Sequence, residues 1–256
     1  MADYHALLEE IDLPQKSRRG SLEHVLALVD PLPRGRALDV PSGPGLLTEA
    51  LRLLGFSVTG ADIDSEQFGL HDSIPFRTLD LDEPLPFPDG CFDLIHCGDG
   101  IEHIENPFAL FREFSRILDE RGTLIVATPN YLNLERKLRF LLTGSLTKPL
   151  KRPSGSGQQS RPTKADRGHI NPLTLTRMAY IAETEGLQLE HAETLLPKAR
   201  QNFLAPLALL LWAYGRFLSR SRRHDLFAEQ TLPLSMLLGG KKLLAVFSKS
   251  GSVPRS

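Results

Sequence analysis

Residues 37–45 read Ala-Leu-Asp-Val-Pro-Ser-Gly-Pro-Gly, an apolar run that contains one acid and ends in a loop of glycine and proline. Such a short apolar run is typical of a buried strand in a parallel sheet. Gly43 and Gly45 carry no side chain, so the backbone of the loop can approach a ligand closely. A helical pattern follows from Leu46. The stretch therefore predicts the first strand, the ligand loop and the first helix of a nucleotide-type site.

Two positions indicate which kind of ligand this loop accepts. A dinucleotide fingerprint needs a third small residue three positions after the second glycine, and that position holds Thr48. The carboxylate of Asp39 would repel a pyrophosphate. We therefore expect a cationic ligand, and a nicotinamide-dependent oxidoreductase is disfavoured.

With Asp39 included, the stretch resembles the first motif of the class I S-adenosylmethionine-dependent methyltransferases, an acid followed by a Gly-x-Gly loop. Pro41 stands where that family more often has a glycine. The resemblance continues through further segments in the family's order, at residues 58–64, 80–87, 92–103 and 116–130. An ordered series of matches is far more specific than a single loop.

The resemblance implies that the cofactor is S-adenosylmethionine and gives roles to particular residues. Asp62, the acid that ends the second strand, would hold the ribose hydroxyls, and it lies about 20 residues beyond the glycine loop, as a ribose-binding acid should. Asp80 would accept a hydrogen bond from the adenine amino group, while Leu81 would pack on the adenine ring. The methionine end would lie where the fourth strand ends. The predicted cofactor-binding residues are Asp39, Pro41, Ser42, Gly43, Gly45, Asp62, Ile63, Asp80, Leu81, Cys97 and Gly98.

The implied reaction is an in-line displacement at the sulfonium of the cofactor. Much of its rate can come from holding the nucleophile beside the methyl carbon, so no catalytic motif is strictly required. An oxygen acceptor does benefit from a base, and histidine titrates near neutral pH. The candidates are His103 and His169, followed by Asp99 and Glu102; the alternative is a histidine that makes only a structural hydrogen bond. His96 lies inside a predicted strand and is interpreted as a core residue.

The pattern of the whole chain predicts an α/β fold. Strands that alternate with helices favour a parallel sheet with ligand loops at the carboxyl ends of the strands. Asn106 and Pro107 are typical of a helix start, and Gly55 of a helix end. The resemblance adds a Rossmann-like, mostly parallel seven-stranded sheet with an antiparallel edge strand and helices on both faces. The expected helices are 46–54, 107–119, 131–142 and 172–185, and the expected late strands are 187–194 and 243–247.

We expect one domain in three parts. Residues 1–35 form an N-terminal helical segment, and residues 36–130 form the Rossmann-like core that binds the cofactor. Residues 131–256 supply acceptor-side helices, a mobile basic loop at 148–168 and the C-terminal strands. For that loop, a solvated linker is one interpretation, and a lid over the acceptor site that attracts an anionic substrate or a membrane surface is the other.

Composition excludes several classes of protein and site. A net charge of −1 argues against general affinity for nucleic acids. The segment 97–100 also lacks the Asn/Asp-Pro-Pro-aromatic turn with which amine methyltransferases grip a flipped base.

No Cys/His cluster has the spacing of a structural zinc site, so no metal is expected. Cys91 and Cys97 flank one short strand and are not expected to pair, which indicates a reducing cytoplasm. Residues 1–20 contain no apolar core long enough for a signal peptide.

Residues 203–218 are nearly all apolar, and Arg220, Arg222 and Arg223 follow directly. The segment is shorter than the roughly 20 residues that span a bilayer. One interpretation is a buried or acceptor-covering helix. The alternative is a peripheral helix that contacts a membrane, with Trp212 among its anchors and the arginines at lipid headgroups.

The sequence therefore predicts a methyltransferase that transfers a methyl group from S-adenosylmethionine to a small molecule. The broad subgroup with similar segments acts on small metabolites, quinone precursors and sugars, so a hydroxyl of a metabolite, sugar or lipid-like compound is the expected acceptor. The alternative is a protein that binds the cofactor but serves a partner enzyme without turnover of its own.

Overall fold

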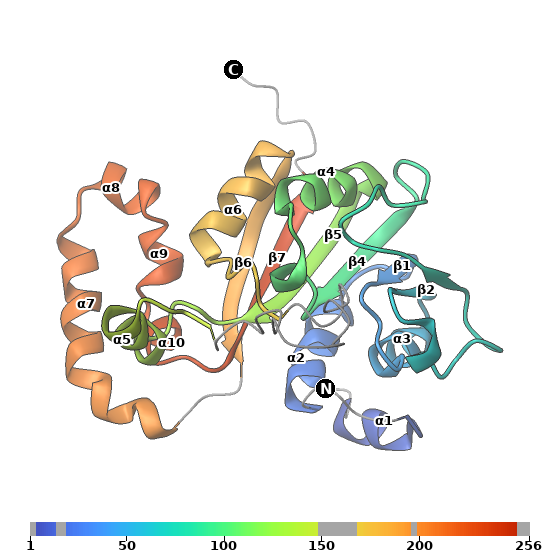
Figure 1. Cartoon of the computed structure of the whole chain (residues 1–256), viewed down its shortest axis with the longest axis horizontal. Helices are drawn as coiled ribbons and strands as arrows, with labels where there is room; N and C mark the ends of the chain where they lie inside the picture. The colour runs from blue at the N-terminus through green and yellow to red at the C-terminus, as the bar shows by residue number, and fades with distance from the viewer. Residues whose placement is uncertain (1–3, 14–18, 148–167, 196–198, 250–256) are drawn as a thin grey trace, which may run out of the picture.

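The computed structural model describes residues 4–13, 19–147, 168–195 and 199–249 and contains one seven-stranded sheet (Figure 1). The strand order is β3-β2-β1-β4-β5-β7-β6. The first five strands of that order pair in parallel, whereas β7 pairs antiparallel with both β5 and β6. The mostly parallel sheet with its antiparallel strand is as predicted, and β7 lies one strand in from the edge. The strands are β1 (Arg36–Asp39), β2 (Ser57–Asp62), β3 (Phe76–Thr78), β4 (Phe92–Gly98), β5 (Leu118–Pro129), β6 (Leu187–Leu195) and β7 (Lys242–Lys249).

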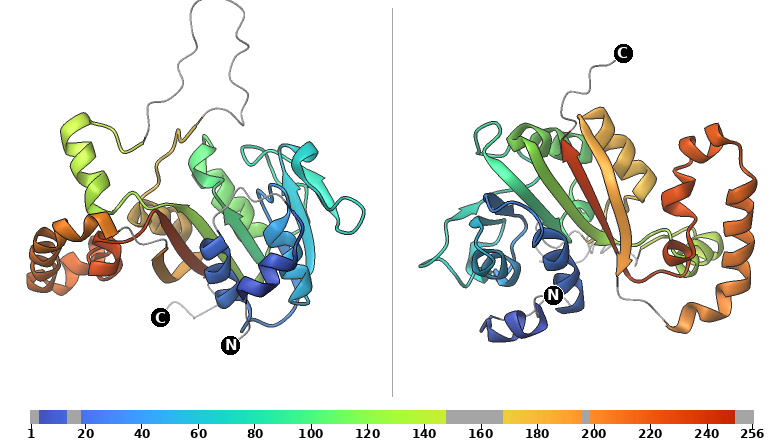
Figure 2. Two further views of the ribbon diagram at one scale, coloured as in Figure 1. Left: turned by 90° about the horizontal axis from the view of Figure 1, so that it is seen from below. Right: turned by 180° about the vertical axis from the view of Figure 1, so that it is seen from behind.

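Helices cover both faces of the sheet, as expected for the family (Figure 2). Successive strand residues point to opposite faces, so a strand contributes side chains to the core on each face of the sheet. Ala37 and Leu94 pack with the helices of one face, while Leu38 and Ile95 pack with those of the other. The first face is covered by α1 (Tyr4–Glu10), α2 (Arg19–Val29) and α3 (Leu46–Leu53), and the second by α4 (Pro107–Ile117) and α6 (Leu175–Thr184).

Helix α3 begins and ends at predicted signals, and α4 begins at one. Helix α3 starts after Gly45, which has φ 97°, and ends before Gly55, which has φ 95°. The Asn106 side chain accepts a hydrogen bond of 3.2 Å from the Ala109 N–H at the start of α4. These local signals fixed the helices that frame the site.

The helix expected at 131–142 is shorter than predicted at its start. Helix α5 (Leu134–Thr143) begins only after Asn133, whose side chain caps it by accepting from the Arg136 N–H. Tyr131 lies outside the helix and is buried. Leu141 and Leu142 are exposed, so the expected apolar stripe does not cover a core along its whole length.

The chain between β6 and β7 forms a helical unit that lies beside α5 and extends outward from the β6 side of the sheet (Figure 1), with Met236 packed in the core of the sheet. Its elements are η4 (Ala199–Leu204), α7 (Ala205–Phe217), α8 (Arg220–Asp225), α9 (Ala228–Thr231) and α10 (Leu234–Leu237). Leu134 of α5 joins Leu204, Ala208 and Leu237 in a small core of this unit. At its two ends the unit meets the sheet where Leu195 pairs with Lys242.

Of the interpretations of 203–218, burial of the helix is wrong for most of its side chains, whereas an acceptor-covering helix and a membrane-contacting helix stay predictions. Within α7 only Ala208 and Gly215 are buried, because the small residues face the neighbouring helices. Most of the large apolar side chains are exposed, while Leu211 packs against the small core of the unit. The basic loop expected at 148–168 lies outside the described residues except for Gly168.

Candidate active site

A cleft of about 460 Å³ opens at the carboxyl ends of the parallel strands, where ligands bind in open α/β sheets. Loops that follow β1, β2, β3 and β4 all contribute to it. Of the predicted cofactor-binding residues, the lining includes Asp39, Pro41, Ser42, Gly43, Asp62, Ile63, Asp80, Leu81 and Gly98. Asp99 and His103 of the predicted catalytic set line it as well. The lining residues that the sequence did not indicate include Ser21, Leu22, Gln67, His96 and Lys242.

The loop after β1 presents an open backbone and a buried hydroxyl. Gly43 has φ 52°, and a Cβ placed there would meet no atom within 4 Å. The Ser42 N–H donates to the Ala61 carbonyl over 2.8 Å, which ties the loop to β2. The buried Ser42 Oγ has no hydrogen-bond partner among the described residues. Since a buried hydroxyl is normally partnered, this oxygen suits a polar ligand in the cleft.

Asp62 is held in place by backbone donors. Its two carboxylate oxygens accept from the Gly43 N–H over 2.8 Å and from the Asp64 N–H over 3.1 Å. Each carboxylate oxygen has room for a further hydrogen bond. The side chain is therefore oriented in the cleft and still able to accept from a ligand's hydroxyl groups.

His96 belongs to the site rather than only to the core. It lines the cleft, and its Nδ1 lies 2.8 Å from Oδ1 of the buried Asp39. A Cβ at Gly98 would lie 2.6 Å from His96 Cε1, so this glycine leaves room for the ring. The strand alternation that sends His96 to the cleft could have indicated this position.

Cys97 and Gly45 do not line the cleft. Cys97 points to the opposite face of β4, into the core beneath α4, and burial raises the pKa of its thiol. Gly45 precedes α3 and sits against Leu70 and Phe68. Both cysteines are free, as predicted.

The adenine side of the predicted site is formed by the segment after β3. Asp80 Oδ1 accepts from the Asp82 N–H over 3.0 Å, which fixes the turn. Asp82 in turn accepts from the Glu105 N–H over 2.7 Å. These contacts join the loop after β3 to the loop after β4.

Glu102, His103 and His169 come together at the other end of the site. Their ligand-type atoms all lie within 4.8 Å of one another. His103 Nδ1 lies 2.9 Å from the Gly168 carbonyl. Because a carbonyl only accepts, Nδ1 carries the proton, and Nε2 of the neutral ring keeps its lone pair. His169 does not line the cleft itself, but its ring centroid is 5.0 Å from that of His103.

The buried carboxyl of Glu102 has a perturbed pKa. Burial, followed by the nearby charge of Asp99, raises the pKa of Glu102 to about 7. The Thr128 hydroxyl donates to Glu102 over 3.0 Å. Burial also raises the pKa of Tyr131, whose hydroxyl lies 3.1 Å from His169 Nδ1. Glu102, His103 and His169 have the composition of a metal-ligand set, and the absence of a metal stays a prediction from the sequence.

Asp99 takes a backbone conformation that is unusual outside glycine, with φ 55°. Its N–H donates to the Ala127 carbonyl over 2.8 Å, and its carboxylate pairs with Lys242 at the start of β7. Lys242 is distant in sequence, so only the sheet order brings it to the cleft.

A model of the methyltransferase domain matches residues 15–192, which include the cleft loops after β1 to β4. The chain belongs to the methyltransferase domain family. The match ends within β6, so the helical unit and β7 lie beyond the part of the chain that the family model covers.

Relatives of the methyltransferase domain agree with this assignment. The ubiquinone biosynthesis O-methyltransferase of Xanthomonas campestris pv. campestris is 33% identical over 133 residues, which are 47% of this chain and 55% of that protein. The chain thus spans about half the length of the curated relatives it matches.

Solved structures show the same fold. A SAM-dependent methyltransferase from Archaeoglobus fulgidus has a TM-score of 0.57 at 18% identity, covering 96% of this chain and 100% of its own. Phosphoethanolamine N-methyltransferase 2 of Haemonchus contortus, solved with S-adenosyl-L-methionine, has a TM-score of 0.54 at 18% identity, covering 90% of this chain and 52% of its own. At these identities the likeness concerns the fold alone.

Proposed function

We propose that this methyltransferase domain binds S-adenosylmethionine in the cleft and transfers a methyl group to a hydroxyl of a small molecule. One observation carries the proposal: Asp39, Asp62 and Asp80 follow or end three neighbouring strands and line a single cleft. An acidic cleft favours a cationic sulfonium compound over a phosphate-bearing nucleotide.

The residues present fit this cofactor. Asp62 is preset by the Gly43 and Asp64 N–H groups and would accept from the two ribose hydroxyls. The unpartnered Ser42 Oγ and the open position at Gly43 suit a polar group that approaches the loop. Asp80 and Leu81 would hold the adenine. When bound, S-adenosylmethionine supplies a methyl group that is already activated for displacement.

His103 is the proposed base. Its Nε2 would accept the proton of the acceptor hydroxyl, while the Gly168 carbonyl keeps the proton on Nδ1 and fixes the ring. Above its pKa, the Glu102 carboxylate would stabilise the imidazolium that forms. Asp99, which lines the cleft, would position the acceptor, and His169 would position the His103 ring that it contacts.

An oxygen acceptor is supported by the name of the curated relatives, which are O-methyltransferases of ubiquinone biosynthesis. We infer that the acceptor is a hydroxylated small molecule, such as a metabolite, a sugar or a quinone-like compound.

The test has two stages. Isothermal titration with S-adenosylmethionine and its demethylated product, with a nicotinamide dinucleotide as control, is expected to show micromolar binding of the first two only. Hydroxylated aromatic compounds are then offered with a labelled methyl donor. Binding without transfer to any acceptor would favour a non-enzymatic cofactor-binding role, and absence of binding would overturn the proposal.

A further inference from the structure

Helix α7 presents its apolar side chains to the outside of the molecule. The side facing the other helices carries small residues, Ala208 and Gly215, and a Cβ at Gly215 would lie 2.7 Å from Leu232. The neighbours therefore approach the helix backbone closely. Apart from Leu211, which packs against the small core of the unit, the larger apolar side chains of the helix are exposed.

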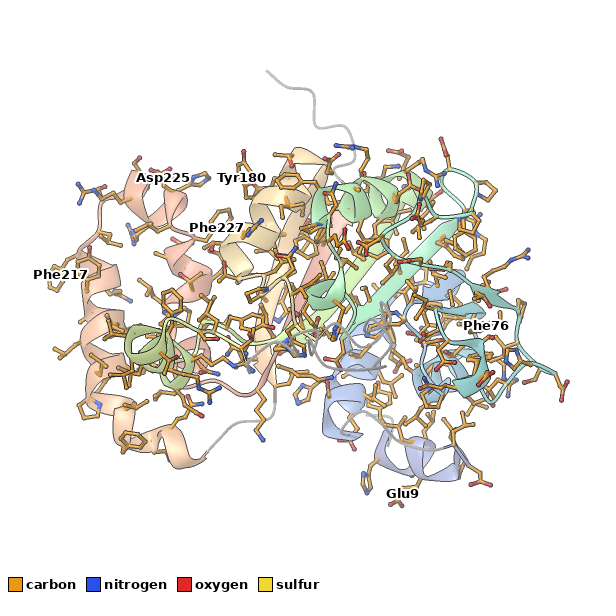
Figure 3. The ribbon with its side chains drawn as sticks, in the orientation of Figure 1. Glu9, Phe76, Tyr180, Phe217, Asp225 and Phe227 are labelled. Atoms are coloured by element: carbon orange, nitrogen blue, oxygen red, sulfur yellow. The ribbon has the colours of Figure 1, made fainter. Side chains whose placement is uncertain are left out.

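The outward side chains form a stripe. Leu207, Leu210, Tyr214 and Phe217 recur at helical spacing and lie within about 80° of one another around the helix axis. They are 37%, 68%, 57% and 88% exposed, and Phe203, just before the helix, is 77% exposed. Figure 3 shows Phe217 at the outer edge of the molecule. Contiguous exposed apolar surface of this kind marks an interaction site.

The length of α7 defines how it can meet a membrane. Its 13 residues give a helix of about 20 Å, shorter than the roughly 30 Å of a hydrocarbon core. Among the described residues, no helix combines the length and apolarity that crossing a bilayer requires. A helix of this kind lies parallel to the surface.

Basic residues outnumber acids in α7 and the helices that follow it. Residues 205–231 contain Arg216, Arg220, Arg222 and Arg223 against two acids, Asp225 and Glu229. Arg216 lies with its guanidinium carbon 5.4 Å from the centroid of the Trp212 ring. Both line a cavity of about 550 Å³ with Arg223, whose buried Nε has no hydrogen-bond partner among the described residues, and with Glu229.

We propose that α7 docks this protein on a lipid bilayer that carries anionic headgroups, with the stripe among the upper acyl chains and the arginines at the phosphates. Tyr and Trp side chains favour this interface because one end is apolar and the other polar. A second copy of the chain would bring the same excess of arginine to the contact, whereas an anionic membrane complements it. The proposal does not depend on the identity of the methyl acceptor.

The test uses the full chain and its own reporter. Trp212 is the chain's one tryptophan, so its fluorescence reports on α7 alone. With vesicles of phosphatidylcholine and phosphatidylglycerol, we expect co-flotation of the protein. Trp212 lies about 140–160° from the stripe residues around the helix axis, so brominated acyl chains should quench its emission only weakly, and strong quenching would contradict the proposed orientation. Vesicles of phosphatidylcholine alone should bind more weakly.

Matched variants separate docking from folding. Leu210→Glu and Phe217→Glu should each lower partitioning at least about tenfold, because each removes an apolar side chain from the bilayer. Arg220→Gln and Arg222→Gln should each lower it about fivefold on anionic vesicles and leave binding to phosphatidylcholine unchanged. Leu53→Glu, at an exposed site on α3, should change nothing. All variants should keep the wild-type melting temperature.

Three results would overturn the proposal. They are no flotation of the wild-type protein, equal flotation of the Phe217→Glu variant, and a concentration-dependent dimer in sedimentation that the stripe substitutions abolish while vesicle binding is absent. The last would assign the stripe to a second copy.

Discussion

The carboxylate of Asp39 is held from two sides, by His96 Nδ1 at 2.8 Å on one oxygen and by the Thr48 hydroxyl at 2.6 Å on the other. The three residues come from β1, β4 and α3, so this acid connects the sheet to the helix that follows the glycine loop. Its orientation toward the cleft is therefore set before any ligand arrives.

Replacing His96 by Ala should destabilise the protein. The substitution leaves one buried carboxylate oxygen of Asp39 without its partner, which costs about 1–3 kcal/mol. Chemical denaturation measures the loss, and titration with S-adenosylmethionine should show weaker binding. His71→Ala, which removes an exposed ring, serves as the control. Unchanged stability of the His96 variant would contradict the structural role of this contact.

Asp62→Ala should weaken S-adenosylmethionine binding by about 100-fold, since hydrogen bonds to a charged group contribute strongly. Titration calorimetry gives the dissociation constant. Asp64→Ala is the matched control, because the Asp64 carboxylate caps the short helix η1 (Ser65–Gln67) by accepting from the Glu66 N–H. Equal affinities of the wild type and the Asp62 variant would refute the assigned site.

His103→Ala should lower turnover by about 10²- to 10⁴-fold and leave cofactor binding nearly intact, as expected when a general base is removed. The comparison needs initial rates at saturating cofactor and a binding titration on the same preparation. His191→Ala, at an exposed position on β6, should retain full activity. A His103 variant with wild-type rates would mean that the ring has only a structural role.

Glu102 should make stability depend on pH in a defined direction. Its pKa rises from 4.5 to about 7 on folding, so the folded state binds the proton more tightly between these values. The stabilisation is present at low pH and is lost as pH rises through the folded pKa. The Glu102→Gln side chain does not titrate, so the variant lacks this loss. Its free energy of unfolding relative to that of the wild type should therefore be about 3 kcal/mol higher at roughly pH 8 than at roughly pH 4. Urea unfolding at both pH values measures it, and a constant difference would disprove the assignment.

Gly45→Ala should destabilise the protein more than Gly90→Ala. Both glycines have positive φ, 97° and 60°, which costs an L residue about 1–2 kcal/mol. A Cβ at Gly45 would also lie 2.9 Å from Leu70 and Phe68, whereas nothing lies within 4 Å at Gly90. The difference in melting temperature between the two variants reports the steric contact together with the less favourable φ at Gly45, and equal losses would exclude both.

Local signals explain what the sequence could predict. Apolar runs, glycines at positive φ and the Asn106 cap act within a few residues, so the strands and several helices were placed nearly as observed. Asp62 and Asp80 line the cleft because the first ends a parallel strand and the second follows one.

The rest of the site depends on contacts between distant segments. Lys242 meets Asp99 only because β7 inserts between β5 and β6, and His169 meets His103 through the path of the chain after Gly168. Apolar composition at 203–218 indicated a helix but not which side would face the protein, since that depends on how closely Leu232 approaches Gly215. Burial was therefore the wrong expectation there.

The pairing of Leu195 with Lys242 means that the helical unit leaves and re-enters the sheet at directly opposed residues. The first and last residues of the unit therefore lie next to each other, as the ends of a hairpin turn do, and the sheet does not set how many residues the unit contains. A longer or shorter excursion at this place changes the closure free energy only slowly. A change in the length of this unit can thus leave the register of β6 and β7 as it is, whereas its removal would also uncover Leu134 of α5, which shares a core with it.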